Sequence, residues 1–126
     1  MTARVLVVED TAANMKLAAM LLRNAGHDVL QAWSAEEGLA LARECRPQLI
    51  LMDMHLPGLD GLAATRMLKA DQRTRAIPVV AVTAFAMSGD EERMLAAGCD
   101  GYIPKPIRYR AFLQEVARFL GPGAKA

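Results

Sequence analysis

The segment Val5-Leu6-Val7-Val8-Glu9-Asp10 is the first indication of the fold class, because a short apolar run rich in β-branched residues is followed at once by two acidic residues. Two later runs, Leu49 to Met52 and Val79 to Val82, have the same apolar character. Continuous apolar runs of this length are typical of strands that are buried on both faces. We therefore expect a sheet that is covered on both sides.

Segments with helical spacing alternate with these strands along the chain. Helices are expected at about 13–25, 35–45, 61–70, 89–97 and 107–119, and two weaker strands at 29–33 and 101–104. Ser34 precedes Glu37 by three residues, the spacing of a capping box for the second helix, and Thr11 is a candidate cap for the first. This order predicts a single (βα)5 domain of the doubly wound α/β class, with a parallel five-stranded sheet. Within 1–126 we expect order from about 3 to 120 and a flexible tail at 121–126.

Composition narrows the classes of function. The chain has 126 residues, 53% hydrophobic and 23% charged, which fits one globular domain and leaves no room for an output domain. With a net charge of +1, the chain does not have the excess of basic residues that is typical of proteins that bind nucleic acid, so we expect no such partner. The apolar runs are far shorter than the roughly 18 residues that cross a bilayer, and there is no secretory signal, so we expect no membrane insertion and a cytoplasmic location. Cys45 and Cys99 are expected to be free thiols.

Polar residues stand where four of the expected strands end. Glu9 and Asp10 follow the first strand, Asp53 the third, Thr83 the fourth, and Lys105 comes just after the fifth. In an open parallel sheet the ligand site forms outside the carboxyl ends of the strands. We therefore expect these side chains to meet at one edge of the sheet.

The chemistry of these residues points to phosphoryl transfer. Gathered carboxylates favour a hard cation, and Asp10 and Asp53, with Glu9 behind them, are suited to Mg²⁺, or to Mn²⁺ in its place. A phosphoryl group at Asp53 would meet the Lys105 ammonium and the Thr83 hydroxyl as well as the cation. The Lys105-Pro106 bond is expected to be cis.

These motifs together resemble the receiver domains of two-component response regulators, and the resemblance covers residues 4 to about 120. It is carried by Val7-Val8-Glu9-Asp10, Leu51-Met52-Asp53-Met54 with Leu56-Pro57-Gly58 and Asp60-Gly61, Val82-Thr83-Ala84, and Tyr102-Ile103-Pro104-Lys105-Pro106. The resemblance implies a flavodoxin-like, CheY-like sheet with strand order 2-1-3-4-5. It also implies a stand-alone phosphoacceptor switch, with self-phosphorylation and autodephosphorylation chemistry but no enzymatic turnover of a substrate.

The resemblance also assigns roles to the site residues. It implies that Asp53 accepts a phosphoryl group from a phosphohistidine of a sensor histidine kinase or a histidine phosphotransfer protein. Asp10, Asp53 and the backbone carbonyl of His55 would ligate Mg²⁺, with Glu9 acting through water. Thr83 and Lys105 would hold the phosphoryl oxygens, and Thr83 and Tyr102 would form the switch. A downstream kinase, cyclase or other signalling protein would read the result.

Several positions bear on specificity and on the lifetime of the phosphorylated state. Thr11 and the pair Arg108-Tyr109 differ from the residues usual in the family at these positions, and they do not identify a partner protein. His55 and Phe85 stand two residues after Asp53 and Thr83, where bulky side chains are expected to slow hydrolysis of the acyl phosphate.

The first helix carries an unusually wide apolar arc, roughly 200° against about 100° for an ordinary core-facing stripe. One interpretation is a docking surface for a histidine kinase, and the other is small alanines that merely tolerate solvent. The residues proposed for the docking surface are Met15, Leu17, Ala18 and Leu22.

Other classes of function fit less well. An Mg²⁺-dependent phosphatase needs a general acid near its nucleophile, but Met54 follows Asp53. A flavodoxin-like cofactor binder needs a glycine-rich phosphate loop after the first strand, where Glu9 and Asp10 stand instead. A receiver that signals without phosphorylation remains open only if its intact site is inaccessible.

Overall fold

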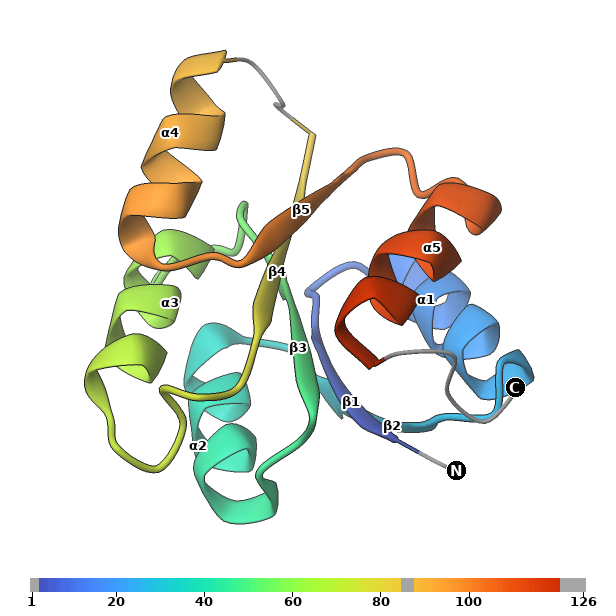
Figure 1. The fold of residues 1–126 in the computed structure, drawn as a ribbon, viewed down its shortest axis with the longest axis horizontal. Helices are drawn as coiled ribbons and strands as arrows, with labels where there is room; N and C mark the ends of the chain where they lie inside the picture. Colours follow the sequence, from blue (N-terminus) through green and yellow to red (C-terminus); the bar gives the residue numbers. More distant parts are fainter. Residues whose placement is uncertain (1–2, 85–87, 121–126) are drawn as a thin grey trace.

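A five-stranded sheet, all of whose strands run parallel, forms the middle layer of the molecule (Figure 1). The computed structural model describes residues 3–84 and 88–120. The strand order is β2-β1-β3-β4-β5, so the expected fold class and topology are confirmed. The elements are β1 Arg4–Val8, α1 Ala12–Asn24, β2 Asp28–Ala32, α2 Ala35–Cys45, β3 Leu49–Asp53, α3 Gly61–Ala70, β4 Val79–Thr83, α4 Ser88–Ala97, β5 Gly101–Pro104 and α5 Tyr109–Leu120.

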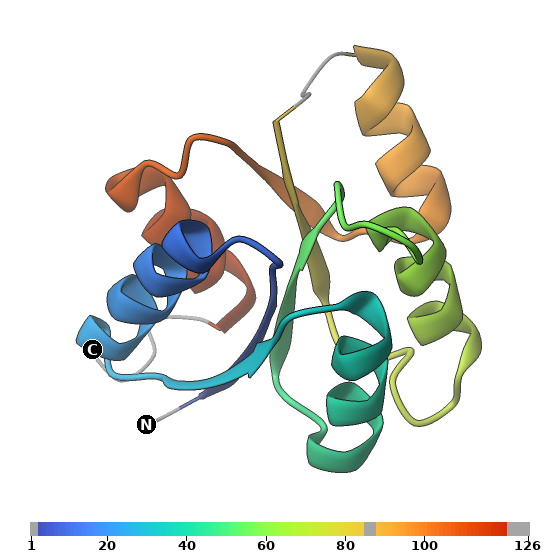
Figure 2. The same ribbon diagram turned by 180° about the vertical axis from the view of Figure 1, so that it is seen from behind.

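The five helices cover the two faces of the sheet unequally. Helices α1 and α5 lie on one face, and α2, α3 and α4 lie on the other, as the two opposite views show (Figures 1 and 2). Alternation along β1 separates the two cores: Val5 and Val7 pack with α1 and α5, whereas Leu6 and Val8 pack with the helices of the opposite face. All four side chains are at most 3% exposed, which explains the continuous apolar sequence of the strand.

The Ser34 half of the capping box expected at α2 is present, whereas the Glu37 carboxylate binds the amide of Trp33, one residue before the N-cap, rather than that of Ser34. Ser34 Oγ accepts a hydrogen bond from the Glu37 amide at 3.1 Å, and Glu37 Oε1 accepts one from the Trp33 amide at 2.9 Å. Thr11 is the N-cap of α1 by position, but its side chain makes no capping hydrogen bond. Helix α1 therefore depends on packing more than on its cap.

The prediction of a docking surface on α1 is wrong for three of its four residues, because they are buried in the structure. Met15, Ala18 and Leu22 are at most 3% exposed and belong to the core that α1 shares with α5, whereas Leu17 is partly buried against it. The apolar arc is wide because α1 packs against two neighbours, the sheet and α5, whereas an ordinary surface helix packs against one.

Two other expectations concern cysteines and membranes. Cys45 is half-buried and Cys99 is buried, and both are free thiols. Within residues 3–84 and 88–120, no helix combines the length and the apolar character that a bilayer span requires.

Candidate functional site

The parallel register brings the predicted polar residues to one edge of the sheet. Asp53 pairs with Val82 and Thr83 pairs with Pro104, so the ends of β3, β4 and β5 are level. Two backbone hydrogen bonds continue this alignment past the strands, from Met54 N to the carbonyl of Val82 at 3.0 Å and from Lys105 N to the carbonyl of Thr83 at 2.7 Å. The residues after the strands are therefore held in place by main-chain pairing.

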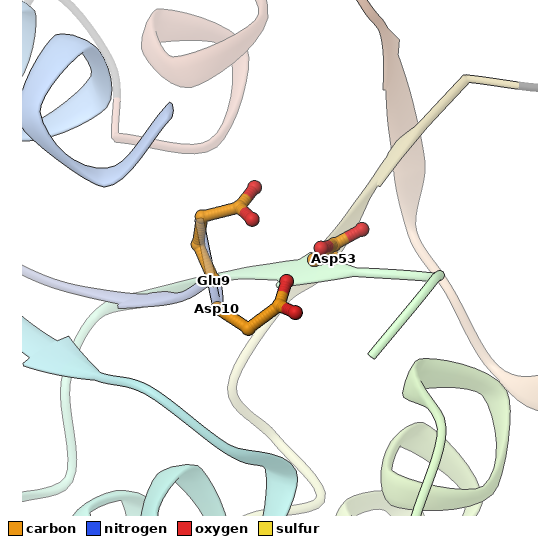
Figure 3. A group of neighbouring side chains, drawn as sticks. All are labelled: Glu9, Asp10 and Asp53. Atoms are coloured by element: carbon orange, nitrogen blue, oxygen red, sulfur yellow. The ribbon is translucent and has the colours of Figure 1, made fainter. Parts of the chain in front are cut away.

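Three carboxylates form the centre of this edge. One oxygen from each of Glu9, Asp10 and Asp53 lies within 4.8 Å of the others, and the side chains are close together beyond β1 and β3 (Figure 3). Glu9 is 3% and Asp53 2% exposed, whereas Asp10 is exposed to solvent. The cluster is therefore buried on the sheet side and open at Asp10.

Lys105 provides a positive charge to two of these carboxylates. Its Nζ lies 3.2 Å from Asp53 Oδ1 and 3.3 Å from Glu9 Oε1. The peptide bond that follows, Lys105-Pro106, is cis as expected. Lys105 thus joins β5 to the carboxylates after β1 and β3.

Burial and charge shift two pKa values in the site. Burial raises the pKa of Glu9 above 4.5, the nearby Asp53 carboxylate raises it further, and the Thr11 amide and the Lys105 ammonium counteract the shift only in part. Burial alone would lower the pKa of Lys105, but the carboxylates of Asp53 and Glu9 outweigh it, and the pKa lies above 10.5. The ammonium is therefore firmly charged at neutral pH.

Main-chain amides orient the two buried carboxylates. The Thr11 amide donates to Glu9 Oε2, and the His55 amide donates to Asp53 Oδ1, both at 3.0 Å. Each donor lies two residues after the carboxylate that it binds, in the loop that follows β1 or β3. The loops therefore hold the carboxylates in place before any ligand arrives.

The His55 ring also reaches Thr83, which the sequence did not indicate. His55 Nε2 lies 3.4 Å from Thr83 Oγ1. Thr83 is 2% exposed at the end of β4, whereas His55 is an exposed residue of the loop between β3 and α3. The expected phosphoryl-binding hydroxyl is thus in contact with the residue two positions after Asp53.

Gly61 belongs to the support of the site, and sequence analysis assigned it no such role. A Cβ at this position would collide with the Asp53 carbonyl oxygen and would lie 2.9 Å from the Cα of Met54. Asp60 begins α3 by accepting a hydrogen bond from the Ala63 amide at 2.8 Å. The signal that could have identified this close approach was the Asp60-Gly61 pair itself, an N-cap followed by a residue without a side chain.

The donors at this edge fit a divalent magnesium ion. The three carboxylates carry three negative charges and Lys105 one positive charge, a balance that a divalent cation would complete. Mg²⁺ prefers oxygen ligands and usually takes one or two carboxylates together with waters. The exposed Asp10 leaves the cluster open for those waters.

The remaining predicted site residues lie apart from the carboxylates or outside the described residues. Tyr102 is half-buried on β5, packs against the core beneath α4, and lines a groove between α4 and α5 with Leu95 and Glu115. Phe85, predicted to influence the lifetime of the phosphorylated state, falls outside residues 3–84 and 88–120.

Comparison with known proteins shows the family to which the chain belongs. Residues 5–117 match the response regulator receiver domain, and the chain belongs to that family. It is 49% identical over 121 residues to the polar-differentiation response regulator DivK of Brucella ovis, an alignment that covers 96% of this chain and 98% of that protein. Phosphorylation-dependent switching is the role of this family, and the expected resemblance is confirmed.

Solved structures give the same result for the fold. The receiver domain of the sensor histidine kinase PA1611 from Pseudomonas aeruginosa superimposes with a TM-score of 0.88 at 34% identity, covering 96% of this chain and 99% of that one. Its structure has a magnesium ion coordinated in the active-site cleft. The chemotaxis protein CheY4 of Vibrio cholerae shares the fold, with a TM-score of 0.90 at 24% identity over 95% of this chain and all of that one.

Proposed function

We propose that Asp53 is the phosphoacceptor of this receiver domain. The observation that carries the proposal is the contact of its buried carboxylate with Lys105 Nζ at 3.2 Å, within a cluster of three carboxylates at the carboxyl edge of the sheet. The His55 amide and the Lys105 ammonium both contact Oδ1, which leaves Oδ2 as the more available nucleophile. This arrangement positions a nucleophile beside a fixed cation.

The donor is a phosphohistidine of a sensor histidine kinase or a histidine phosphotransfer protein. A carboxylate oxygen of Asp53 forms a bond to phosphorus while the phosphorus–nitrogen bond breaks, and the electron pair leaves with the donor imidazole. The product is an acyl phosphate on Asp53. Lys105 and the Thr83 hydroxyl hold the phosphoryl oxygens, because both lie at the same edge of the sheet.

Asp10, Asp53 and the backbone carbonyl of His55 would hold Mg²⁺, with Glu9 acting through water and Mn²⁺ as a substitute. The ion, when bound, would neutralise the charge that develops on the transferred phosphoryl oxygens. The chain's own contribution is orientation: the Thr11 and His55 amides fix the carboxylates of Glu9 and Asp53.

Phosphorylation would then change the surface around Tyr102. Movement of the Thr83 hydroxyl toward the phosphoryl group vacates space beneath β5, and the half-buried Tyr102 ring turns inward. The altered face docks to a downstream kinase, cyclase or other signalling protein in the cytoplasm, with no part for nucleic acid. His55 and Phe85 slow hydrolysis of the acyl phosphate by restricting the approach of water.

The first test is the intact mass of the protein after incubation with acetyl phosphate. We expect one phosphoryl adduct that requires both Mg²⁺ and Asp53, and therefore none in Asp53→Asn. Asp28→Asn is a matched control, because Asp28 is an exposed aspartate at the opposite edge of the sheet, where β2 begins. An adduct on Asp53→Asn, or none on the wild type in any condition, would refute the proposal.

A further inference from the structure

The contact between the His55 ring and the Thr83 hydroxyl links the phosphoacceptor loop to the expected switch residue. The two residues are 28 positions apart, and only the close alignment of β3 and β4 brings His55 Nε2 to within 3.4 Å of Thr83 Oγ1. The backbone of His55 is held by the hydrogen bond that its amide donates to Asp53 Oδ1. One residue thus contacts the phosphoacceptor through its main chain and the switch through its side chain.

We propose that His55 is a positioning residue. Its ring restrains the Thr83 hydroxyl until a phosphoryl group on Asp53 replaces the ring as the partner of that hydroxyl. This inference rests on the proposed function, because it assumes that the phosphoryl group forms on Asp53 and recruits Thr83. It differs from the effect of His55 on hydrolysis, since it concerns the equilibrium between the two positions of Thr83 rather than the approach of water.

Hydrogen-bond chemistry gives the reason for competition. A threonine hydroxyl has one hydrogen to donate, and the oxygens of a phosphoryl group are acceptors. The contact fits either direction of hydrogen bonding, and our proposal takes Nε2 of His55 as the acceptor of the Thr83 hydrogen, which is then not available to a phosphoryl oxygen. The phosphoryl group must therefore replace the imidazole as acceptor.

The geometry also sets the size of the effect. A separation of 3.4 Å is long for a hydrogen bond, so the restraint is weak and readily reversed. Because His55 is an exposed residue of a loop, its ring can turn toward solvent without opening the core, whereas Thr83 is 2% exposed. We expect His55 to tune the switch by a small factor rather than to block it.

The test measures binding of beryllofluoride, a stable phosphoryl mimic, in the presence of Mg²⁺, so that hydrolysis does not contribute. We expect His55→Leu to bind the mimic about 2- to 10-fold more tightly than the wild type, the factor that one modest hydrogen bond corresponds to. His55→Gln, which restores an acceptor oxygen, should return the affinity toward that of the wild type.

A double-mutant cycle separates restraint of Thr83 from simple bulk over the site. In a Thr83→Ala background, His55→Leu should leave the affinity for beryllofluoride unchanged. In the unliganded protein with Thr83 present, the NMR chemical shift of the Thr83 methyl carbon should change in the single variant His55→Leu. An equal gain in both backgrounds, or no gain in either, would overturn the inference while leaving the phosphoacceptor role intact. Failure of the wild type to bind the mimic with Mg²⁺ would instead overturn the proposed function and the inference with it.

Discussion

Asp10→Asn is expected to stabilise the metal-free protein while it abolishes the response to magnesium. One oxygen of Asp10 lies within 4.8 Å of carboxylate oxygens from both Glu9 and Asp53. The ion pairs that Lys105 makes at this site, at 3.2 and 3.3 Å, are with those other two carboxylates. The substitution therefore removes two like-charge repulsions and leaves both ion pairs in place.

The magnitude follows from the separation and from the exposure of Asp10. Two unit charges 4.8 Å apart repel by about 1 kcal/mol in the dielectric of water, the limit appropriate to an exposed carboxylate. Two such pairs give an expected gain of about 1–2 kcal/mol in the free energy of unfolding. For a chain of 126 residues, this corresponds to a rise of about 4–8 °C in Tm.

The assay is urea and thermal unfolding at pH 7 and low salt, in EDTA and then in Mg²⁺. We expect Asp10→Asn to exceed the wild type in EDTA, and the difference to shrink or reverse in Mg²⁺ because only the wild type gains binding energy. Asp28→Asn serves as the control, since it removes an exposed aspartate at the other edge of the sheet. An Asp10→Asn protein no more stable than the wild type in EDTA would refute the electrostatic reasoning.

Three further predictions concern the support of the site and the core. Gly61→Ala should lower the free energy of unfolding by about 1–3 kcal/mol and slow phosphoryl uptake, because the added methyl group displaces the Asp53 carbonyl; unchanged urea unfolding would contradict this. His27 is buried with no partner for Nδ1 among the described residues, and burial lowers its pKa below 6.5. The folded protein therefore resists protonation of His27, so the free energy of unfolding is unaffected by this group above pH 6.5 and decreases as the pH falls below that value. His27→Leu should flatten the stability profile between about pH 7 and 5, and an unaltered slope would exclude this account. Phe112→Ala should cost about 3–5 kcal/mol in urea unfolding, because Phe112 is fully buried where α5 meets the sheet, and a loss below about 1 kcal/mol would place it outside the core.

The sequence was sufficient to predict the fold and the gathering of the site. Buried parallel strands have a continuous apolar sequence, and their carboxyl ends meet by topology, so the positions of Asp53, Thr83 and Lys105 followed from finding where the strands end. The contacts that orient these groups did not follow. The Thr11 and His55 amides reach their carboxylates through loop conformations, which no periodicity encodes.

The error on α1 has a different physical origin. The width of an apolar arc shows how much of a helix surface is apolar. It does not show whether that surface is exposed to solvent, binds a partner or packs against another helix of the same chain. Here α5 provides it: Phe112 and Val116 share a core with Met15 and Leu22. A sequence distinguishes these cases only when the packing of every helix is known, and α5 is far from α1 along the chain.

The carboxylate cluster connects stability to function in this fold. Burial and the charge of Asp53 raise the pKa of Glu9, which means that the folded, metal-free chain holds this charge at a cost in free energy. Lys105 offsets part of that cost through its two ion pairs. A ligand that completes the charge balance stabilises the folded state by about 1.4 kcal/mol for each tenfold excess over its dissociation constant. Neutralising Asp10, which leaves both ion pairs of Lys105 intact, would therefore stabilise the metal-free protein, so at this position stability measured without metal opposes the metal binding that we propose.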